Sequence, residues 1–102
     1  IVHYRAERET AKTVVGDGLL LVDSGGQYRG GTTDNTRTRV IGTPSAEMRE
    51  MFTRVLKGHI AVASARFGEG TTGRDIDMLA RQFLRKAGLD YGHGTGHGVG
   101  AY

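Results

Sequence analysis

The chain has 102 residues, enough for one small domain, and its composition excludes several classes of protein. Cysteine is absent, which excludes disulfides, thiolate metal sites and a cysteine nucleophile, and is compatible with a reducing compartment. The net charge of +3 comes from scattered basic residues without interleaved aromatic rings, so nucleic acid is not favoured as a partner. No apolar run approaches the roughly 18 residues of a membrane span and no signal-peptide pattern opens the chain, so we expect a cytoplasmic protein without a membrane partner.

The first part of the chain favours β-structure. A short strand is expected at residues 1–4, before a polar and charged connection. The continuous apolar run of residues 19–22 predicts a buried strand that ends at Asp23. Turn signals around residues 28–31 and the β-branched residues after them predict a hairpin over residues 19–41.

The second part favours two helices. Pro44 is expected at the first helical position with Thr43 as the N-cap, and apolar residues continue at helical spacing to about Arg66. A second amphipathic helix is expected to begin near Thr72, with acidic residues in its first turn, and to close at Gly88.

These elements predict an α+β fold. The order is strands, two helices and then a glycine-rich segment, residues 92–100, which is expected to return to the sheet. Both helices are expected to pack on one face of an antiparallel sheet.

Two aspartates stand out against this frame. Asp23 follows an apolar strand, where an ionised carboxylate needs a partner, a cap or a metal. The predicted hairpin brings Asp34 opposite or diagonal to Asp23, and two neighbouring carboxylates either raise one another's pKa or share a cation. The alternative makes Asp23 a turn former before Gly25, and Asp34 an exposed strand residue or a partner of Arg37.

The glycine-rich segment carries the two histidines His93 and His97. Alternating glycines remove side chains beside each imidazole, so the backbone can approach a site closely. Imidazole and carboxylate together suit Mn, Fe, Co or Zn, whereas the lack of sulfur ligands argues against a structural zinc site. The alternative is a flexible loop with solvated histidines.

The same segment formally fits the dinucleotide fingerprint at Gly96, Gly98 and Ala101. That motif needs an apolar strand before it and a helix after it. Residues 89–95 are polar and glycine-rich, and no helix follows, so this interpretation is rejected.

Four motifs together resemble a known family. They are IVHY (residues 1–4), LLVDSGGQY (20–28), GTTDNTRT (31–38) and HGTGHGVG (93–100). In order and spacing the whole chain is similar to the Xaa-Pro aminopeptidases (aminopeptidase P), a branch of the pita-bread metallopeptidases that also include prolidase and methionine aminopeptidase. The resemblance implies a partial pita-bread fold.

The resemblance also implies roles for particular residues. Asp23 matches the aspartate that chelates one metal ion, Asp34 the aspartate that bridges two, and His97 the histidine ligand of the second. His93 matches the catalytic histidine that binds substrate or assists proton transfer, and His3 a second substrate-binding histidine. The implied cofactors are two divalent ions, typically Mn²⁺ with Co²⁺ or Zn²⁺ as alternatives, bridged by a hydroxide that attacks the bond before proline.

The family completes its site with two glutamate ligands, one of them the general base, and both are expected beyond residue 102. Residues 1–102 are therefore expected to form a partial catalytic domain, inactive by itself, with an uncovered sheet edge and helix face. The implied partners are peptides with proline at the second position, and the intact enzyme is expected to be a homo-oligomer. A prolidase-type dipeptidase and a non-catalytic pita-bread module that binds peptides or proteins remain as alternatives; retention of the metal ligands favours an enzyme.

Overall fold

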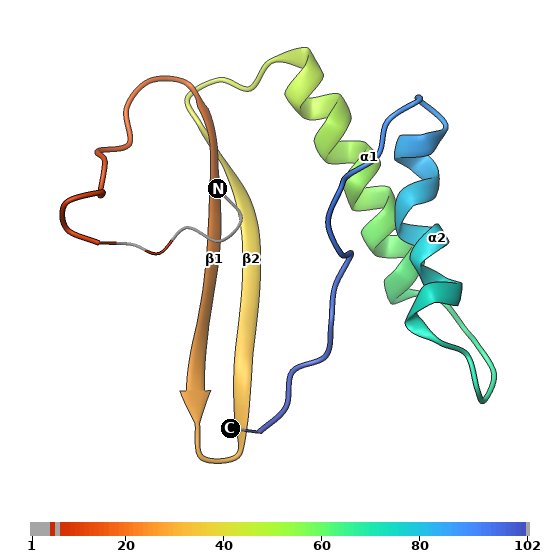
Figure 1. Ribbon diagram of the computed structural model, residues 1–102. Helices are drawn as coiled ribbons and strands as arrows, with labels where there is room; N and C mark the ends of the chain where they lie inside the picture. The colour runs from red at the N-terminus through yellow and green to blue at the C-terminus, as the bar shows by residue number, and fades with distance from the viewer. Residues whose placement is uncertain (1–4, 6, 102) are drawn as a thin grey trace.

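The computed structural model describes residue 5 and residues 7–101, and it contains one hairpin and two helices (Figure 1). The elements follow in the order β1, β2, α1, α2, which confirms the α+β class. The strand expected at residues 1–4, and His3 within it, lie outside the described residues. Within the described part of the chain, neither helix is long and apolar enough to cross a membrane.

The hairpin pairs β1 (Gly18–Tyr28) with β2 (Gly31–Ile41) in antiparallel register, from Gly18 opposite Ile41 to Tyr28 opposite Gly31. The predicted hairpin and its turn position are confirmed. The prediction that the first strand ends at Asp23 is wrong, because β1 continues to Tyr28. The Thr-rich β2 extends the ladder along the whole of β1, since β-branched residues favour strand pairing.

Helix α1 (Ala46–Ala63) begins at a serine cap. The Ser45 hydroxyl oxygen accepts a hydrogen bond from the Met48 backbone N–H at 3.1 Å, which satisfies one of the unpaired donors of the first turn. The predicted cap at Thr43 is therefore wrong by two residues, and Pro44 lies before the helix. The helix ends at Ala63, three residues before the predicted Arg66, where the Ser64 hydroxyl donates to the Ile60 carbonyl at 2.7 Å.

Helix α2 (Gly73–Arg85) begins where the sequence predicts. The Asp75 carboxylate accepts hydrogen bonds from the backbone N–H of Thr72 at 2.8 Å and from its hydroxyl at 2.7 Å. These bonds, the one from the hydroxyl first, lower the pKa of Asp75. The acidic first turn also suits the positive end of the helix dipole.

The core of the described residues lies where the two helices cross. Ala80 and Leu84 of α2 are the buried hydrophobic side chains of the described chain, at 8% and 7% exposure. Gly58 of α1 is buried against the Ala80 backbone. Arg54 of α1 adds a polar tie, because its Nη1 donates to the Phe83 carbonyl at 3.1 Å.

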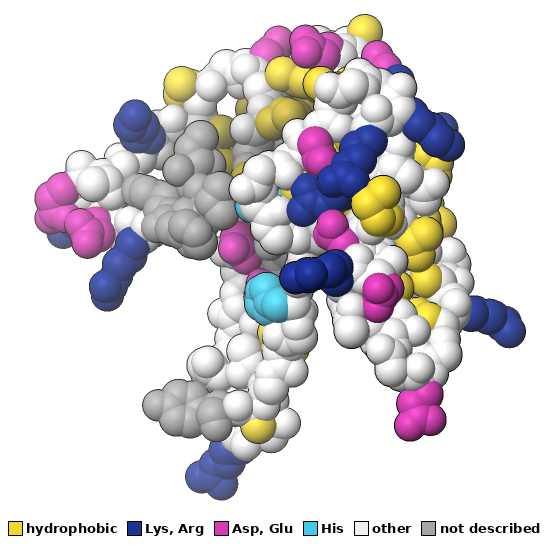
Figure 2. All heavy atoms as spheres, turned by 45° about the vertical axis from the view of Figure 1, so that its right-hand side comes forward, with side chains coloured by type: hydrophobic (Ala, Val, Ile, Leu, Met, Phe, Trp, Pro, Cys, Tyr) yellow, Lys and Arg dark blue, Asp and Glu magenta, His cyan; other side chains and the backbone are white. Residues whose placement is uncertain are grey.

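Both helices lie on one side of the hairpin, as expected (Figure 1). An open groove of about 550 Å³ separates α1 from the strands, however, and its walls include Leu19 and Val40 of the hairpin and Met48 and Phe52 of α1. The predicted buried strand at residues 19–22 is consequently wrong in its burial: Leu19 is 53% exposed, because the described residues place no second layer against it. Hydrophobic side chains remain visible at the surface in Figure 2, in agreement with the expected uncovered faces.

Candidate metal centre

Asp23 and Asp34 lie on the same face of the hairpin. Asp23 is opposite Thr36 in the ladder and Asp34 is opposite Gly25, so the two aspartates are diagonal neighbours. Side chains two residues apart along a strand share a face, and diagonal neighbours are about 7–8 Å apart, within reach of ligands to neighbouring cations. Of the two predicted placements, opposite or diagonal, the register gives the diagonal one.

The position and contacts of Asp23 and Asp34 distinguish between a metal role and the structural alternatives predicted for them. Asp23 lies inside β1 rather than in a turn, and its Oδ1 accepts a hydrogen bond from the Thr36 hydroxyl at 3.0 Å. Arg37 does not pair with Asp34; its Nη1 donates instead to the Thr36 carbonyl at 2.8 Å. The turn former and the ion pair with Arg37 are therefore wrong, whereas the third alternative describes Asp34 correctly, because it lies in β2 with its side chain 38% exposed.

Gly25 occupies the ladder position opposite Asp34. A Cβ at position 25 would lie 2.4 Å from the Thr33 carbonyl oxygen, so the ladder as it stands admits only glycine there. The absence of a side chain leaves the face of the hairpin open beside the Asp34 carboxylate.

The glycine-rich segment, residues 92–100, contains neither helix nor strand, so its expected return to the sheet does not produce a third strand. It does run from the helices back to the hairpin (Figure 1), where His97 Nε2 lies 3.2 Å from Asp34 Oδ2. A ladder is not formed because alternating glycines offer little to pack on a pleated surface.

The orientation of His97 fits a metal ligand. Its Nδ1 lies 2.8 Å from the Gly98 carbonyl oxygen, and a carbonyl can only accept, so Nδ1 carries the proton and Nε2 faces Asp34. A lone pair on Nε2 and a carboxylate oxygen repel each other unless a proton or a cation lies between them. Two ligands bound to one cation at about 2.0–2.2 Å are about 3.0–3.5 Å apart, and the observed 3.2 Å falls within that range.

The donor set is nevertheless incomplete. In the part of the chain that the structure describes, no three His, Asp or Glu side chains converge closely enough to hold a metal ion. Asp34 and His97 form a facing pair, and Asp23 stands one diagonal step away. The two carboxylates and the imidazole are ligand types that Mn, Fe, Co and Zn accept, so the residues present fit part of a metal centre.

His93 does not join this pair. Its ring stacks on Tyr91 with centroids 4.8 Å apart, and its Nδ1 lies 2.8 Å from the Gly94 carbonyl oxygen. The contact of His93 with α2 is made by its backbone carbonyl, which accepts a hydrogen bond from Arg81.

Sequence reasoning missed a polar network between α2 and the glycine-rich segment. Its centre is Arg81, whose guanidinium donates to Asp77, to Asp90 and to the backbone carbonyls of Tyr91 and His93. The only available signal was the spacing of Asp77 and Arg81, four residues apart on one helix face, which fits an ion pair. Figure 2 shows acidic and basic side chains gathered on the helical side of the molecule.

The charges of this network shift several pKa values. Hydrogen bonds from Arg85 and then Arg81 lower the pKa of Asp90 to about 2. The pKa of Asp77 is lowered first by the Thr95 hydroxyl, which donates to its Oδ1, and then by Arg81. The hydrogen bond to Asp90 raises the pKa of Arg81 further.

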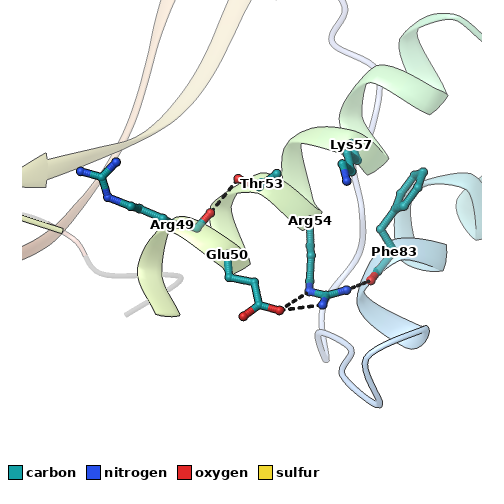
Figure 3. Close-up of a pocket in the computed structure, with 6 residues that line it drawn as sticks. All are labelled: Arg49, Glu50, Thr53, Arg54, Lys57 and Phe83. Carbon is teal, nitrogen blue, oxygen red and sulfur yellow. Dashed lines mark hydrogen bonds and ion pairs between the residues drawn. The ribbon is translucent and has the colours of Figure 1, made fainter. Parts of the chain in front are cut away.

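A shallow pocket of about 310 Å³ lies apart from the predicted site residues, between α1 and the end of α2 (Figure 3). Arg54 pairs there with Glu50 at 2.6 Å, and Lys57 lines the same pocket. Among the predicted site residues that the structure describes, Asp23, Asp34, His93 and His97 line neither this pocket nor the groove beside the hairpin.

The whole chain, residues 1–102, matches metallopeptidase family M24. It belongs to that family. Over all 102 residues the chain is 55% identical to a "Probable Xaa-Pro aminopeptidase P" of Paracoccidioides brasiliensis, 56% identical to one of Fusarium vanettenii, and 53% identical to "Aminopeptidase P1" of Arabidopsis thaliana. These alignments cover 17%, 16% and 16% of the relatives, so the chain spans about one sixth of their length. Membership of family M24 confirms the resemblance drawn from the four motifs.

Proposed function

We propose that this chain forms part of the metal centre of an aminopeptidase that removes an N-terminal residue from a peptide with proline in second place. The observation that carries the proposal is the pair Asp34 Oδ2 and His97 Nε2, 3.2 Å apart, with Asp23 on the same face of the hairpin. The names of the relatives from Paracoccidioides brasiliensis, Fusarium vanettenii and Arabidopsis thaliana support the substrate class.

Asp23, Asp34 and His97 would hold the divalent ions, with Asp34 between two of them and Mn²⁺ as the metal. A bound metal pair supplies a water nucleophile at neutral pH and stabilises negative charge on the carbonyl oxygen under attack. Thr36 orients Asp23 through its hydrogen bond to Oδ1, and the Gly98 carbonyl fixes the His97 tautomer.

His93 and His3 would contact the substrate. The ring of His93 stacks on Tyr91 and its backbone is bound by Arg81, so a substrate that reaches His93 meets an imidazole of fixed position. In that position His93 would donate a hydrogen bond to the scissile amide or transfer a proton to it.

The aminopeptidase is favoured over its two alternatives by what this chain retains. A non-catalytic peptide-binding module has no use for the ligand-type residues Asp23, Asp34 and His97, which this chain retains. A prolidase-type dipeptidase uses the same ligands, but the relatives that match the whole chain are named for aminopeptidase P. We further propose a cytoplasmic enzyme and a homo-oligomer, supported by the absence of cysteine and by the exposed apolar faces of the hairpin and α1.

Calorimetric titration of the chain with Mn²⁺ tests the metal centre. We expect saturable binding that the double variant Asp23→Asn, Asp34→Asn abolishes, because it removes both carboxylates of the site. The control is Glu47→Gln with Glu69→Gln, which removes two acidic charges at positions without a proposed ligand role. Equal Mn²⁺ uptake by the wild type and the Asp23/Asp34 variant would show that these residues are not ligands.

Peptide assays test the reaction. We expect the isolated chain to bind metal without releasing the first residue of an Xaa-Pro peptide, because it supplies three ligands and no glutamate close to them. Release at a rate proportional to chain concentration, and lost in Asp34→Asn, would contradict this expectation. Within a longer chain that contains residues 1–102, Asp34→Asn and His97→Asn should each abolish release of a residue before proline.

A further inference from the structure

The Arg81 guanidinium is bound on every side. Its Nε and Nη1 donate to Asp77 and Asp90 at 2.8 and 2.9 Å, and the side chain is only 12% exposed. Two further hydrogen bonds go to backbone carbonyls, from Nη1 to Tyr91 at 2.7 Å and from Nη2 to His93 at 2.8 Å. The guanidinium also lies 4.0 Å from the centroid of the Tyr91 ring. The carboxylates of Asp77 and Asp90 fix the orientation of the guanidinium, and its hydrogen bonds to the two carbonyls restrain the backbone at Tyr91 and His93.

The path of the glycine-rich segment depends on hydrogen bonds of this kind. It has no regular secondary structure, and a Cβ at any of its five glycines would meet no atom within 4 Å. Packing therefore does not define its path, and glycine loses more conformational freedom on ordering than any other residue. Besides the Arg81 bonds, the Thr95 hydroxyl ties it to Asp77, and His97 reaches Asp34.

We propose that Arg81 is a positioning residue, which holds the carbonyls of Tyr91 and His93 so that His97 faces Asp34. This inference rests on the proposed metal centre, because positioning His97 matters only if His97 is a ligand. The hydrogen bonds of Arg81 themselves involve none of the proposed ligands. His97 is four residues after the held carbonyl of His93, so it stays within about 14 Å of a fixed point. Arginine suits the task because its planar fork can bond two carboxylates and two carbonyls at once, which a lysine ammonium cannot do with the same geometry.

NMR relaxation of backbone amides in the metal-free chain tests the proposal. In Arg81→Gln we expect the order parameters of residues 93–97 to fall from values near the rigid limit of about 0.85 toward about 0.6 or below, while those of α1 stay unchanged. The matched control is Arg85→Gln, one turn along the same helix, because Arg85 binds Asp90 and touches no carbonyl of the segment. An equal loss of order in both variants, or none in Arg81→Gln, would overturn the proposal.

A second variant covers the case in which Arg81→Gln does not fold. Thr95→Val removes the hydroxyl that bonds Asp77 and Tyr91 while leaving α2 intact, so partial loosening of the segment is expected. Arg81→Lys keeps the positive charge without the fork, and it should loosen the segment almost as much as Arg81→Gln. Full rescue by lysine would show that charge alone suffices and would contradict the positioning role.

Mn²⁺ separates this inference from the proposed function. Paramagnetic broadening of the His97 imidazole proton signals should appear in the wild type at Mn²⁺ concentrations about tenfold lower than in Arg81→Gln, the loss expected for an outer partner of a metal ligand. Arg85→Gln should match the wild type. If the wild type shows no broadening, the metal centre fails while the relaxation result still decides the role of Arg81. If broadening is equal in Arg81→Gln, the positioning role is wrong and the metal centre stands.

Discussion

Gly58 of α1 lies so close to Ala80 of α2 that a Cβ at position 58 would stand 2.1 Å from the Ala80 carbonyl oxygen. The obstacle is helix backbone, so it cannot move aside as a flexible side chain would. The contact lies at the crossing that buries Ala80 and Leu84, which are the hydrophobic core of the described chain. The close packing of α1 against α2 therefore requires glycine at position 58.

Gly58→Ala should separate the helices. Although alanine favours a helix more than glycine does, the overpacking should cost about 1–3 kcal/mol net and lower the urea midpoint. Gly68→Ala is the control, because a Cβ there meets no atom within 4 Å. Unfolding followed by circular dichroism checks the difference, and a Gly58→Ala variant as stable as the wild type would contradict the close crossing.

The start of α1 can be tested by exchanging its two candidate caps. Ser45→Ala removes the oxygen that accepts the Met48 N–H, and it should lower the free energy of unfolding by about 1 kcal/mol. Thr43→Ala, at the cap that the sequence pattern favours, should change stability by less than half as much. The reverse order of these effects in urea unfolding would place the helix start at Pro44.

Local signals in the sequence predicted most of the secondary structure. The β-branched residues and turn signals around residues 28–31 located the hairpin, and Thr72 marked the start of α2. The start of α1 was misplaced because Thr43-Pro44 and Ser45 both satisfy the rules for a helix start, and only the bond to Met48 distinguishes them. The prediction that residues 19–22 are buried was wrong, because an apolar run shows that a strand could be buried but not whether a second layer covers it.

The candidate site was predicted in part: the placement of the two aspartates, but not the contacts of the glycine-rich segment. Spacing and the position of the turn placed Asp34 opposite or diagonal to Asp23, and the register of the ladder decides for the diagonal. The approach of His97 to Asp34 and the role of Arg81 could not be predicted from spacing. Both depend on the path of a glycine-rich segment, which no periodicity describes and which long-range contacts to α2 determine.

Gly25→Ala should damage the hairpin beside Asp34. The added Cβ would lie 2.4 Å from the Thr33 carbonyl oxygen, so the ladder must shift at the residue before Asp34. We expect a stability loss of about 1–3 kcal/mol together with weaker Mn²⁺ binding. Gly31→Ala, at the turn end of the same ladder with open space around it, is the control for both measurements. Unchanged Mn²⁺ affinity in a destabilised Gly25→Ala variant would separate the ladder position from the metal centre.

Asp90 gives the fold a defined acid dependence. Its pKa is lowered from 3.8 to about 2 by Arg85 and Arg81, so its carboxylate favours the folded state. That contribution is complete above about pH 4 and is lost as the pH falls toward 2, since the unfolded state takes up the proton first. Wild-type melting temperature should therefore fall between pH 4 and 2, with contributions of the same sign from Asp75 and Asp77. Asp90→Asn should melt at a lower temperature at pH 6 and show a smaller fall, whereas Glu69→Gln should follow the wild type. An Asp90→Asn profile parallel to that of the wild type would show that the two arginines do not stabilise the folded state through this carboxylate.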